Sequence, residues 1–237
     1  MSTPKITVFG LAFEGEVLPG DSIAERILAS CRAAELTLED DDIVVVTHKV
    51  VSKAEGRVAA LDKWDGEARE RLVLEESARI VRRREGLIIA QTKHGFICAN
   101  AGVDSSNVEP GFVTLLPLDP DKSARRIRSQ LRRSSGADVA VIITDTFGRP
   151  WRIGQVNVAI GVAGMLPLRN YRNAEDSFGQ MLLVTNIAVA DEIAGAAELV
   201  MGKSEGIPVA VVRGAKVPRG RGNARQLLRP SQEDLFL

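Results

Sequence analysis

The feature that most constrains this chain is an apolar, β-branched run at residues 139–144 that leads directly into polar side chains. The segment 139–152 reads VAVIITDTFGRPWR, and its first half predicts a strand buried on both faces. Asp145, Thr146, Arg149 and Arg152 follow the apolar run. Proteins that alternate strands and helices usually bind ligands at the carboxyl ends of buried strands. Oxygen ligands and guanidinium groups favour a metal bound to a phosphate, and a plain polar turn is the alternative.

The order of the remaining elements predicts an α+β fold with a mixed sheet. Further strands are expected at residues 6–11, 42–47, 87–92, 96–99, 112–117, 155–163 and 208–214. Helices are expected at residues 67–84, 119–134, 182–203 and 223–229, and another begins with Asp21 as its N-cap. Because the two strands around Lys93-His94-Gly95 form a hairpin, a purely parallel sheet is not expected.

The composition of the 237 residues argues against several classes of function. Lys and Arg number 31, as do Asp and Glu, so no net charge attracts nucleic acid or an anionic membrane. Aromatic residues make up 4%, too few for a base-stacking surface. Cys31 and Cys98 match no metal or redox spacing and are expected in the core of a protein from a reducing compartment. No apolar run is long enough to span a bilayer, so a cytoplasmic protein is expected.

Two other strand ends carry side chains that suit the same chemistry. Ser52 and Lys53 follow the strand at residues 42–47 within a few positions, and a lysine is a point-charge binder of phosphate. Asp104 and Asn107 follow the strand at residues 96–99. Asp104 is a second candidate ligand for a hard metal, although Asp and Asn also bond their own backbone in Asx-turns.

Known nucleotide and catalytic motifs are absent from the chain. It contains no G-x-x-x-x-G-K-[ST], no G-x-G-x-x-G, no G-x-S-x-G and no H-E-x-x-H. Two aspartates, a threonine and nearby cations would nevertheless suit phosphoryl transfer, in which catalysis is positioning and charge neutralisation. The pattern of residues therefore predicts an enzyme that binds a metal and a phosphate, but it does not identify the reaction.

Several long motifs resemble the coenzyme factor 420:L-glutamate ligase family, in order and over nearly the whole chain. They are SKAEGR at residues 52–57, NAGVDSSNV at 100–108, LPLDPDKSA at 116–124, VIITDTFGRPWRIGQ at 141–155, VADEIAGAAELVMGK at 189–203 and PVAVVRG at 208–214. The tail, with ARQLLRP at residues 224–230, resembles the ligase half of the two-domain actinobacterial form. On this resemblance, residues 1–237 are expected to form one ligase domain with a smaller second lobe and no reductase domain.

The resemblance implies a GTP-dependent reaction that adds L-glutamate to the deazaflavin coenzyme precursor. The GTP γ-phosphate would activate the precursor's carboxylate as an acyl phosphate, and the amino group of glutamate would displace the phosphate. Further glutamates would extend a γ-glutamyl tail. Mg²⁺ or Mn²⁺, with K⁺ as a further candidate cation, would assist, and the family implies a homodimer. The segments 156–163 and 182–201 are rich in small and apolar residues, which an interface or internal packing explains equally well.

Matching motifs carry the family's site residues to this chain. The implied metal ligands are Asp104, Asp145 and Thr146, and no residue is assigned as a general base or as catalytic beyond the metal and phosphate ligands. The implied nucleotide contacts are Leu11, Ala12, Phe13, Glu14, Lys53, Asn107, Lys203, Ser204, Glu205 and Gly206, with Glu205 a further candidate for a metal. The chain departs from the family at Leu11-Ala12-Phe13, where Leu-Pro is usual, and at His48, where Ser or Thr is usual. The alternatives are a nucleotide- or deazaflavin-binding protein without turnover and a metal-dependent phosphohydrolase.

Overall fold

A five-stranded mixed sheet forms the centre of the molecule. The computed structural model describes residues 3–61, 65–172, 174–182 and 186–235. The sheet order is β1 (Thr7–Leu11), β12 (Val209–Arg213), β2 (Ile43–Thr47), β8 (Ala140–Arg149) and β9 (Arg152–Ala163). Only β2 and β8 run parallel, and the other neighbours are antiparallel. The predicted α+β class and mixed sheet are confirmed.

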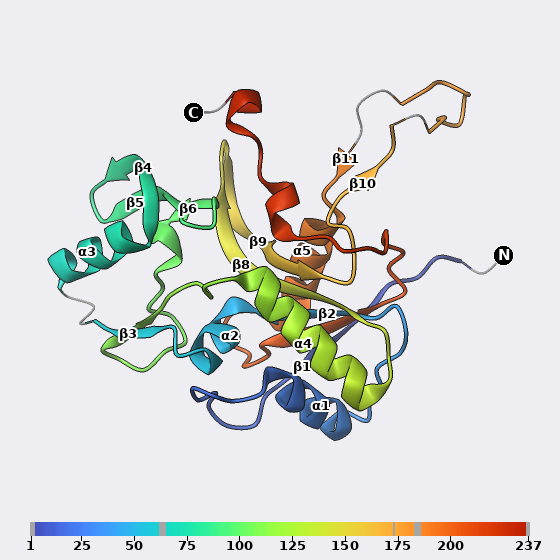
Figure 1. Cartoon of the computed structure of the whole chain (residues 1–237), viewed down its shortest axis with the longest axis horizontal. Helices are drawn as coiled ribbons and strands as arrows, with labels where there is room; N and C mark the ends of the chain where they lie inside the picture. Colours follow the sequence, from blue (N-terminus) through green and yellow to red (C-terminus); the bar gives the residue numbers. More distant parts are fainter. Residues whose placement is uncertain (1–2, 62–64, 173, 183–185, 236–237) are drawn as a thin grey trace.

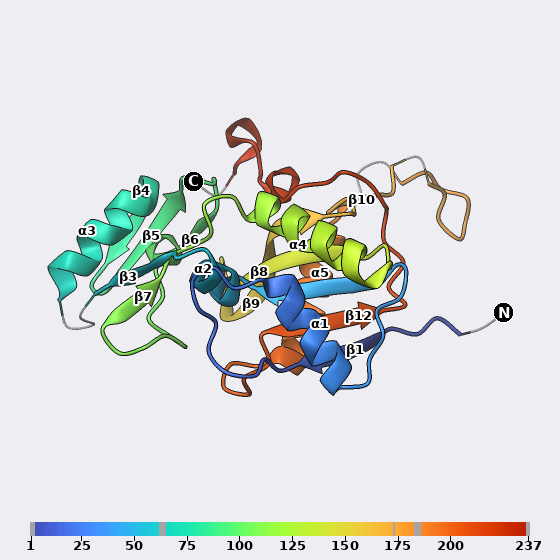
Figure 2. The ribbon, with the colours of Figure 1, turned by 60° about the horizontal axis from the view of Figure 1, so that its bottom comes forward.

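Helices cover both faces of this sheet. Helices α1 (Ile23–Ala33) and α4 (Pro120–Ser135) lie on one face, and α5 (Val189–Met201) lies on the other (Figures 1 and 2). The start of α4 is set by Asp119, whose carboxylate accepts a hydrogen bond from the Lys122 amide at 2.8 Å. Its end is set by Gly136, which adopts the left-handed conformation at φ 81°. The apolar stripe of α4 is buried, and its arginines mostly face outward.

The sequence suggested that the polar half of segment 139–152 follows the end of a strand. In the structure this half lies within a long hairpin. Strand β8 continues to Arg149 because β9 pairs with its polar half, placing Asp145 opposite Val158 and Thr146 opposite Asn157. The register shifts between Ile143 and Thr144, which marks a β-bulge next to the polar residues. The bulge adjusts the direction in which the following side chains point.

A smaller lobe stands beside the sheet (Figures 1 and 2). It contains β3 (Val58–Ala60) paired with β7 (Phe112–Thr114), and the three-stranded sheet of β4 (Ser77–Arg84), β5 (Leu87–Thr92) and β6 (Ile97–Ala99). Helix α3 (Gly66–Glu76) and the short η1 (Asn100–Gly102) belong to it. The lobe has an apolar cluster of its own, made by Leu61, Val73, Ala90, Ala101, Val103, Val113 and Leu115.

The helix predicted at residues 67–84 is wrong in its second half. Residues 66–76 are helical, but residues 77–84 form β4 and pair with β5. The segment SARIVRRR has helix-compatible residues, and the partner strand β5, just beyond the next turn, selects the extended form. The hairpin of residues 87–99 is confirmed.

Other element boundaries move for local reasons. Ser22, not Asp21, caps α1, because Asp21 accepts from the Leu18 amide and from Arg26 instead. Helix α5 begins at Val189, since residues 186–187 form β11 (Asn186–Ile187) against β10 (Arg169–Asn170), while residues 183–185 lie outside the described part. The tail forms two short 3-10 turns, η2 (Ala224–Leu227) and η3 (Ser231–Glu233).

Two further sequence predictions can be compared with burial. Both cysteines are buried, as expected for core thiols. Of the two segments proposed as interface or internal packing, residues 157 and 159–163 are buried, and α5 buries Val189, Ala190, Ile193, Ala194, Ala197 and Met201. Within the described residues, no helix is both long and apolar enough to cross a membrane.

Candidate functional site

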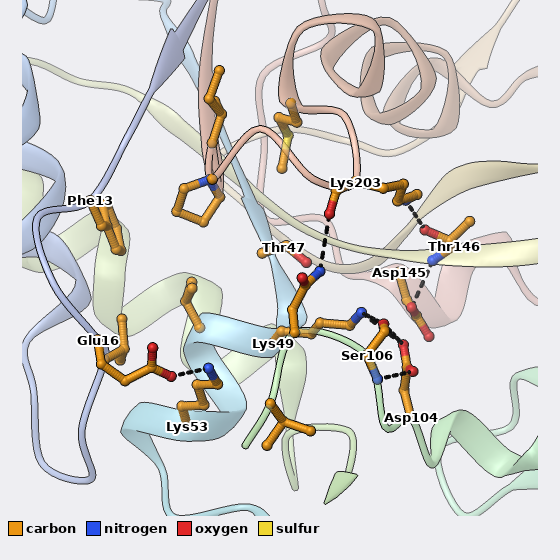
Figure 3. A pocket seen from close by; sticks show the side chains of 18 of the residues that line it. Phe13, Glu16, Thr47, Lys49, Lys53, Asp104, Ser106, Asp145, Thr146 and Lys203 are labelled. Atoms are coloured by element: carbon orange, nitrogen blue, oxygen red, sulfur yellow. Dashed lines mark hydrogen bonds and ion pairs between the residues drawn. The ribbon is translucent and has the colours of Figure 1, made fainter. Parts of the chain in front are cut away.

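A cleft of about 1300 Å³ lies between the central sheet and the smaller lobe (Figure 3). Its lining comes from the loop after β1, from α2 (His48–Ala54), from the loop after η1, from β8 and β9, and from the end of α5 with the loop that follows. Segments far apart in sequence therefore converge on one cavity. Its volume exceeds the ~300–1,000 Å³ typical of sites for one small ligand, so there is room for more than one substrate.

The wall formed by the sheet presents Asp145, Thr146 and Asn157. The Thr146 amide donates to Oδ1 of Asp145 at 2.7 Å, which holds that carboxylate beside its own backbone. The Thr146 hydroxyl donates to Oδ1 of Asn157 at 2.7 Å, across the β8–β9 pair. From α5 and the loop after it, Glu198 and Lys203 complete this wall: Lys203 Nζ lies 2.6 Å from the Thr146 hydroxyl and 2.5 Å from Glu198 Oε1.

The wall formed by the smaller lobe presents Asp104 and Ser106 to Lys49 of α2. Lys49 Nζ lies 2.8 Å from Asp104 Oδ2 and also contacts the Ser106 hydroxyl. The Ser106 amide donates to Asp104 Oδ1 at 2.8 Å, which is the Asx-type contact that the sequence offered as an alternative. Burial alone would raise the pKa of Asp104, but Lys49 and Ser106 together hold it below its ordinary value. Asp104 is therefore a carboxylate whose negative charge is stabilised in place.

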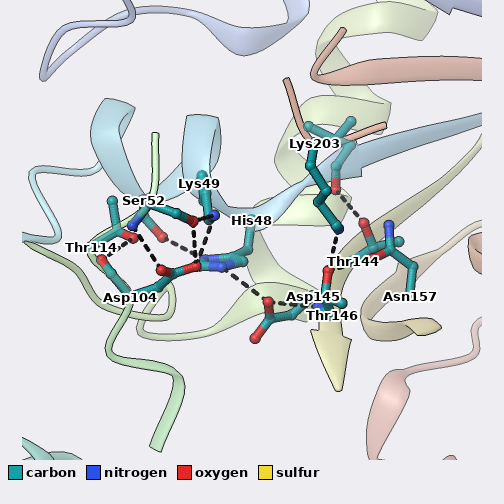
Figure 4. A network of polar contacts seen from close by, with 12 residues as sticks. His48, Lys49, Ser52, Asp104, Thr114, Thr144, Asp145, Thr146, Asn157 and Lys203 are labelled. Atoms are coloured by element: carbon teal, nitrogen blue, oxygen red, sulfur yellow. Dashed lines mark hydrogen bonds and ion pairs between the residues drawn. The ribbon is translucent and has the colours of Figure 1, made fainter. Parts of the chain in front are cut away.

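A buried histidine lies behind Asp145 (Figure 4). His48 is 1% exposed; its Nδ1 lies 3.4 Å from the Ser52 hydroxyl and its Nε2 lies 3.3 Å from Asp145 Oδ1. The Nε2 contact is close enough for an ion pair but lacks the geometry of a hydrogen bond, so this buried nitrogen has no hydrogen-bond partner.

Burial, with Asp145 nearby, raises the pKa of the Cys98 thiol to about 12, so this cysteine is inert.

Two contacts tie the remaining side chains of the cleft together. Lys53, one helical turn after Lys49, forms an ion pair with Glu16 from the loop after β1. Asn107 has a left-handed backbone at φ 54°, and its amide nitrogen donates to the Lys203 carbonyl at 3.2 Å. Asn107 thus links the smaller lobe to the loop after α5, across the opening between the two walls.

The oxygen atoms of the cleft fit a magnesium-like ion that also binds a substrate phosphate. Among the described residues, no group of three or more His, Cys, Asp or Glu side chains could enclose a metal. Mg²⁺ seldom needs such a cage, because one or two carboxylates, waters and substrate phosphates usually complete its octahedron. Asp104, Asp145 and the hydroxyl of Thr146 supply this kind of partial set, and lysines stand beside it to meet phosphate oxygens.

Most of the residues predicted from the sequence line this cleft. They are Phe13, Lys53, Asp104, Asn107, Asp145, Thr146, Lys203, Ser204 and Gly206. The three predicted metal ligands come from both walls, which the sequence could not show.

Other predicted residues lie away from the lining. Leu11 is buried in the core, and the carbonyls of Ala12 and Glu14 accept hydrogen bonds from Ser30 and Arg26 of α1. The Glu205 carboxylate turns back onto its own loop, and the Ser204 amide, the largest of several hydrogen-bonding causes, lowers its pKa.

Three further residues that the sequence suggested for phosphate binding have surroundings other than the cleft. Ser52 is fully buried beside His48, so its hydroxyl does not face the cleft. Arg149 donates to the Ile153 carbonyl at 2.7 Å within the tip of the β8–β9 hairpin. Arg152 begins β9 at the same tip, and neither arginine is among the described residues that line the cleft.

Sequence reasoning did not identify Ser106, Asn157 or Glu198 as site residues, and it offered Lys49 only as one of two lysines after a buried strand; all four line the cleft. Lys49 carries a usable signal, because it lies four residues before Lys53 and therefore on the same helical face. Asn157 carries another, because a polar residue within the small, apolar run QVNVAIGVA requires a buried partner. Glu198 reaches the site only because α5 packs against β9, which no local pattern reveals.

Comparison with known proteins identifies close relatives. The sequence model of the F420-0:gamma-glutamyl ligase family matches residues 14–214. The coenzyme F420:L-glutamate ligase of Methanocaldococcus jannaschii is 42% identical, over 98% of this chain and 97% of its own length. The same-named protein of Methanothermobacter thermautotrophicus is 41% identical over 98% of both chains. That of Methanococcus maripaludis is 42% identical over the full length of both.

Proposed function

Because the chain belongs to the F420-0:gamma-glutamyl ligase family, we propose that it joins L-glutamate to a deazaflavin coenzyme precursor in a reaction driven by GTP. Family membership supports the ligation. The observation that supports a phosphoryl-transfer route is the convergence of Asp104, Asp145 and Thr146 with Lys49, Lys53 and Lys203 in one cleft. Carboxylate and hydroxyl oxygens beside several ammonium groups are the set that a nucleotide triphosphate with its metal requires.

The proposed chemistry activates a carboxylate, which is otherwise a poor electrophile. An oxygen of the precursor's carboxylate attacks the γ-phosphorus of GTP, the bond to the β-phosphate oxygen breaks, and an acyl phosphate and GDP form. The amino group of L-glutamate then attacks the acyl carbon. The new amide bond forms as the bond from carbon to phosphate oxygen breaks, inorganic phosphate leaves, and the amine loses its proton.

The side chains of the cleft would bind and orient these groups. Lys49, Lys53 and Lys203 would neutralise phosphate oxygens, and the two aspartates with Thr146 would hold Mg²⁺ or Mn²⁺. When bound, the metal would supply positive charge that reduces the repulsion between the phosphates and an incoming carboxylate. Lys49 and Lys203 already pair with the proposed metal ligands Asp104 and Thr146, so both are within reach of a phosphate bound there.

The test is a ligation assay with purified protein, GTP, Mn²⁺, L-glutamate and the unglutamylated coenzyme, with and without K⁺. We expect a mass gain of one glutamyl unit, matched by GDP, and repeated gains if the protein extends a tail. GTP hydrolysis that does not depend on glutamate would instead identify a phosphohydrolase. Nucleotide binding without GDP release would identify a binding protein, and either result overturns the proposal.

A homodimer is part of the same proposal. The chain exposes several large apolar side chains: Trp151 and Ile153 at the β8–β9 tip, Phe178 in the arm after β10, and Leu199 on α5. Such side chains favour association, and light scattering at several concentrations measures it directly. A molar mass equal to that of one chain at every concentration would contradict the dimer.

A further inference from the structure

The side chains of Lys203, Thr146, Asn157 and Glu198 form a closed ring of polar contacts in the cleft. Figure 4 labels the first three of these residues. Lys203 Nζ donates to the Thr146 hydroxyl at 2.6 Å, and that hydroxyl donates to Asn157 Oδ1 at 2.7 Å. Asn157 Nδ2 donates to Glu198 Oε2 at 2.6 Å. Glu198 Oε1 lies 2.5 Å from Lys203 Nζ and closes the ring. No residue of this ring apart from Thr146 and Lys203 was expected at the site.

Three hydrogen bonds run in one direction, from Lys203 through Thr146 and Asn157 to Glu198. Glu198, which also accepts from Lys203, sets that direction. An ionised carboxylate can only accept, so the Asn157 amide must turn its nitrogen toward Glu198 and its oxygen toward Thr146. Asn157 is 4% exposed, so water offers little alternative. The Thr146 hydroxyl therefore gives its one proton to Asn157 and keeps its lone pairs for whatever cation lies in front of it.

That cation is the Lys203 ammonium in the present structure. It lies against one hydroxyl oxygen and one charged oxygen, both within 2.6 Å. A metal bound to Thr146 would be a second positive charge at the same oxygen, and like charges within contact distance of one another repel even near the protein surface. The ammonium and a metal therefore compete for this position.

We propose that Glu198 and Asn157 are positioning residues that aim the Thr146 hydroxyl at a divalent cation, and that Lys203 occupies this position until the cation arrives. The inference rests on the proposed role of Thr146 as a metal ligand. The displaced ammonium is then free to meet a phosphate, so one exchange of cations prepares both the metal and the lysine. Glu198 acts through Asn157 on the orientation of Thr146 and through its own charge on the cation.

A purely structural ion pair between Glu198 and Lys203 makes a different prediction. If the pair only secured the end of α5, removing either partner would have the same effect on metal binding. If the proposal holds, the two removals have opposite effects. Glu198→Gln removes the charge and frees the Asn157 amide to turn, because glutamine can donate as well as accept. Lys203→Met removes the competitor.

The experiment titrates the full chain with Mn²⁺ alone, without nucleotide, and follows free Mn²⁺ by electron paramagnetic resonance. Compared with the unmodified chain, Glu198→Gln should weaken binding about tenfold or more, as is typical for residues that orient a metal ligand. Lys203→Met should bind Mn²⁺ more tightly. Glu192→Gln, which changes an exposed carboxylate on the first turn of the same helix, is the control and should leave the affinity unchanged.

Three results would overturn the inference: an unmodified chain that binds no Mn²⁺, equal affinities in all four proteins, or weaker binding in both Glu198→Gln and Lys203→Met. Melting curves recorded without metal confirm that each variant is folded. The outcome is separate from that of the ligation assay. Affinities in the expected order without glutamate ligation would overturn the proposed function alone, and ligation with equal affinities would overturn the inference alone.

Discussion

The two walls of the cleft hold the same kinds of side chain on different kinds of backbone. Asp145 and Thr146 lie on β8, which pairs with β9, and the residues of β8 that precede them are completely buried. Asp104 and Asn107 lie on a loop, after Ala101 with its left-handed φ of 51°. That loop is held by two backbone hydrogen bonds between Asp104 and Thr114, at 3.0 and 2.8 Å. One wall is therefore built on the most constrained part of the molecule, and the other on a loop fastened to a small sheet.

The surroundings of the two aspartates differ as well. Asp104 faces a lysine and a serine, which stabilise its charge. Asp145 accepts from the Thr146 amide and has a buried histidine behind it, with no lysine or arginine within ion-pair distance in the part of the chain that the structure describes. Asp145 thus depends more on whatever cation enters the cleft, whereas Asp104 already has one. This contrast ranks the effects expected from changing each wall.

The largest effect is expected from the two aspartates. Asp145→Asn should lower kcat/KM for ligation at least about a hundredfold, because a bound metal contributes several kcal/mol of charge stabilisation. Asp104→Asn should cost less, since Lys49 is released at the same time and can meet a phosphate. Steady-state kinetics with circular dichroism as the folding control measures both. A larger loss in Asp104→Asn would reverse the ranking of the two walls.

A second comparison concerns the apolar clusters beneath the walls. Ile143 lies in the sheet's cluster and Leu115 in the cluster of the smaller lobe. Each change to alanine should destabilise its own surroundings by about 2–5 kcal/mol. In Leu115→Ala, we expect faster hydrogen exchange in β5 while β8 stays protected; Ile143→Ala should raise exchange in β8. Equal increases everywhere in both variants would mean that the walls unfold as one unit.

The smallest effect concerns the charge pair of the lobe's wall. In Lys49→Met, the pKa of Asp104 should rise, because burial then acts without the lysine that opposes it. In the unmodified chain the lowered pKa stabilises the fold above about pH 4, and this contribution is lost as pH falls through the pKa of the folded state. Carboxyl NMR titration reports the pKa, and Lys216→Met, at an exposed lysine, is the control. An unchanged Asp104 titration would show that Lys49 has no influence on it.

Much of the fold follows from local patterns in the sequence. Buried strands such as β2 and β8 appear as β-branched runs, and α4 appears as an apolar stripe between Asp119 and Gly136, because periodicity and capping act over a few residues. The three oxygen ligands proposed for a metal were predicted from motifs that resemble those of the ligase family, and all three line the cleft. The error at residues 77–84 arose where the pairing partner β5, beyond the next turn, outweighed local preference.

The segment 139–152 shows the limit of what the sequence alone determines. By itself it determined a buried strand followed by a carboxylate and a hydroxyl, because each depends only on residue type and order. The tertiary structure decided that the strand continues through these residues, that Asn157 stands opposite Thr146, and that Glu198 and Lys203 reach the same hydroxyl from α5. Register and packing bring these groups together, and contacts between residues far apart in sequence leave no periodic signal in either segment.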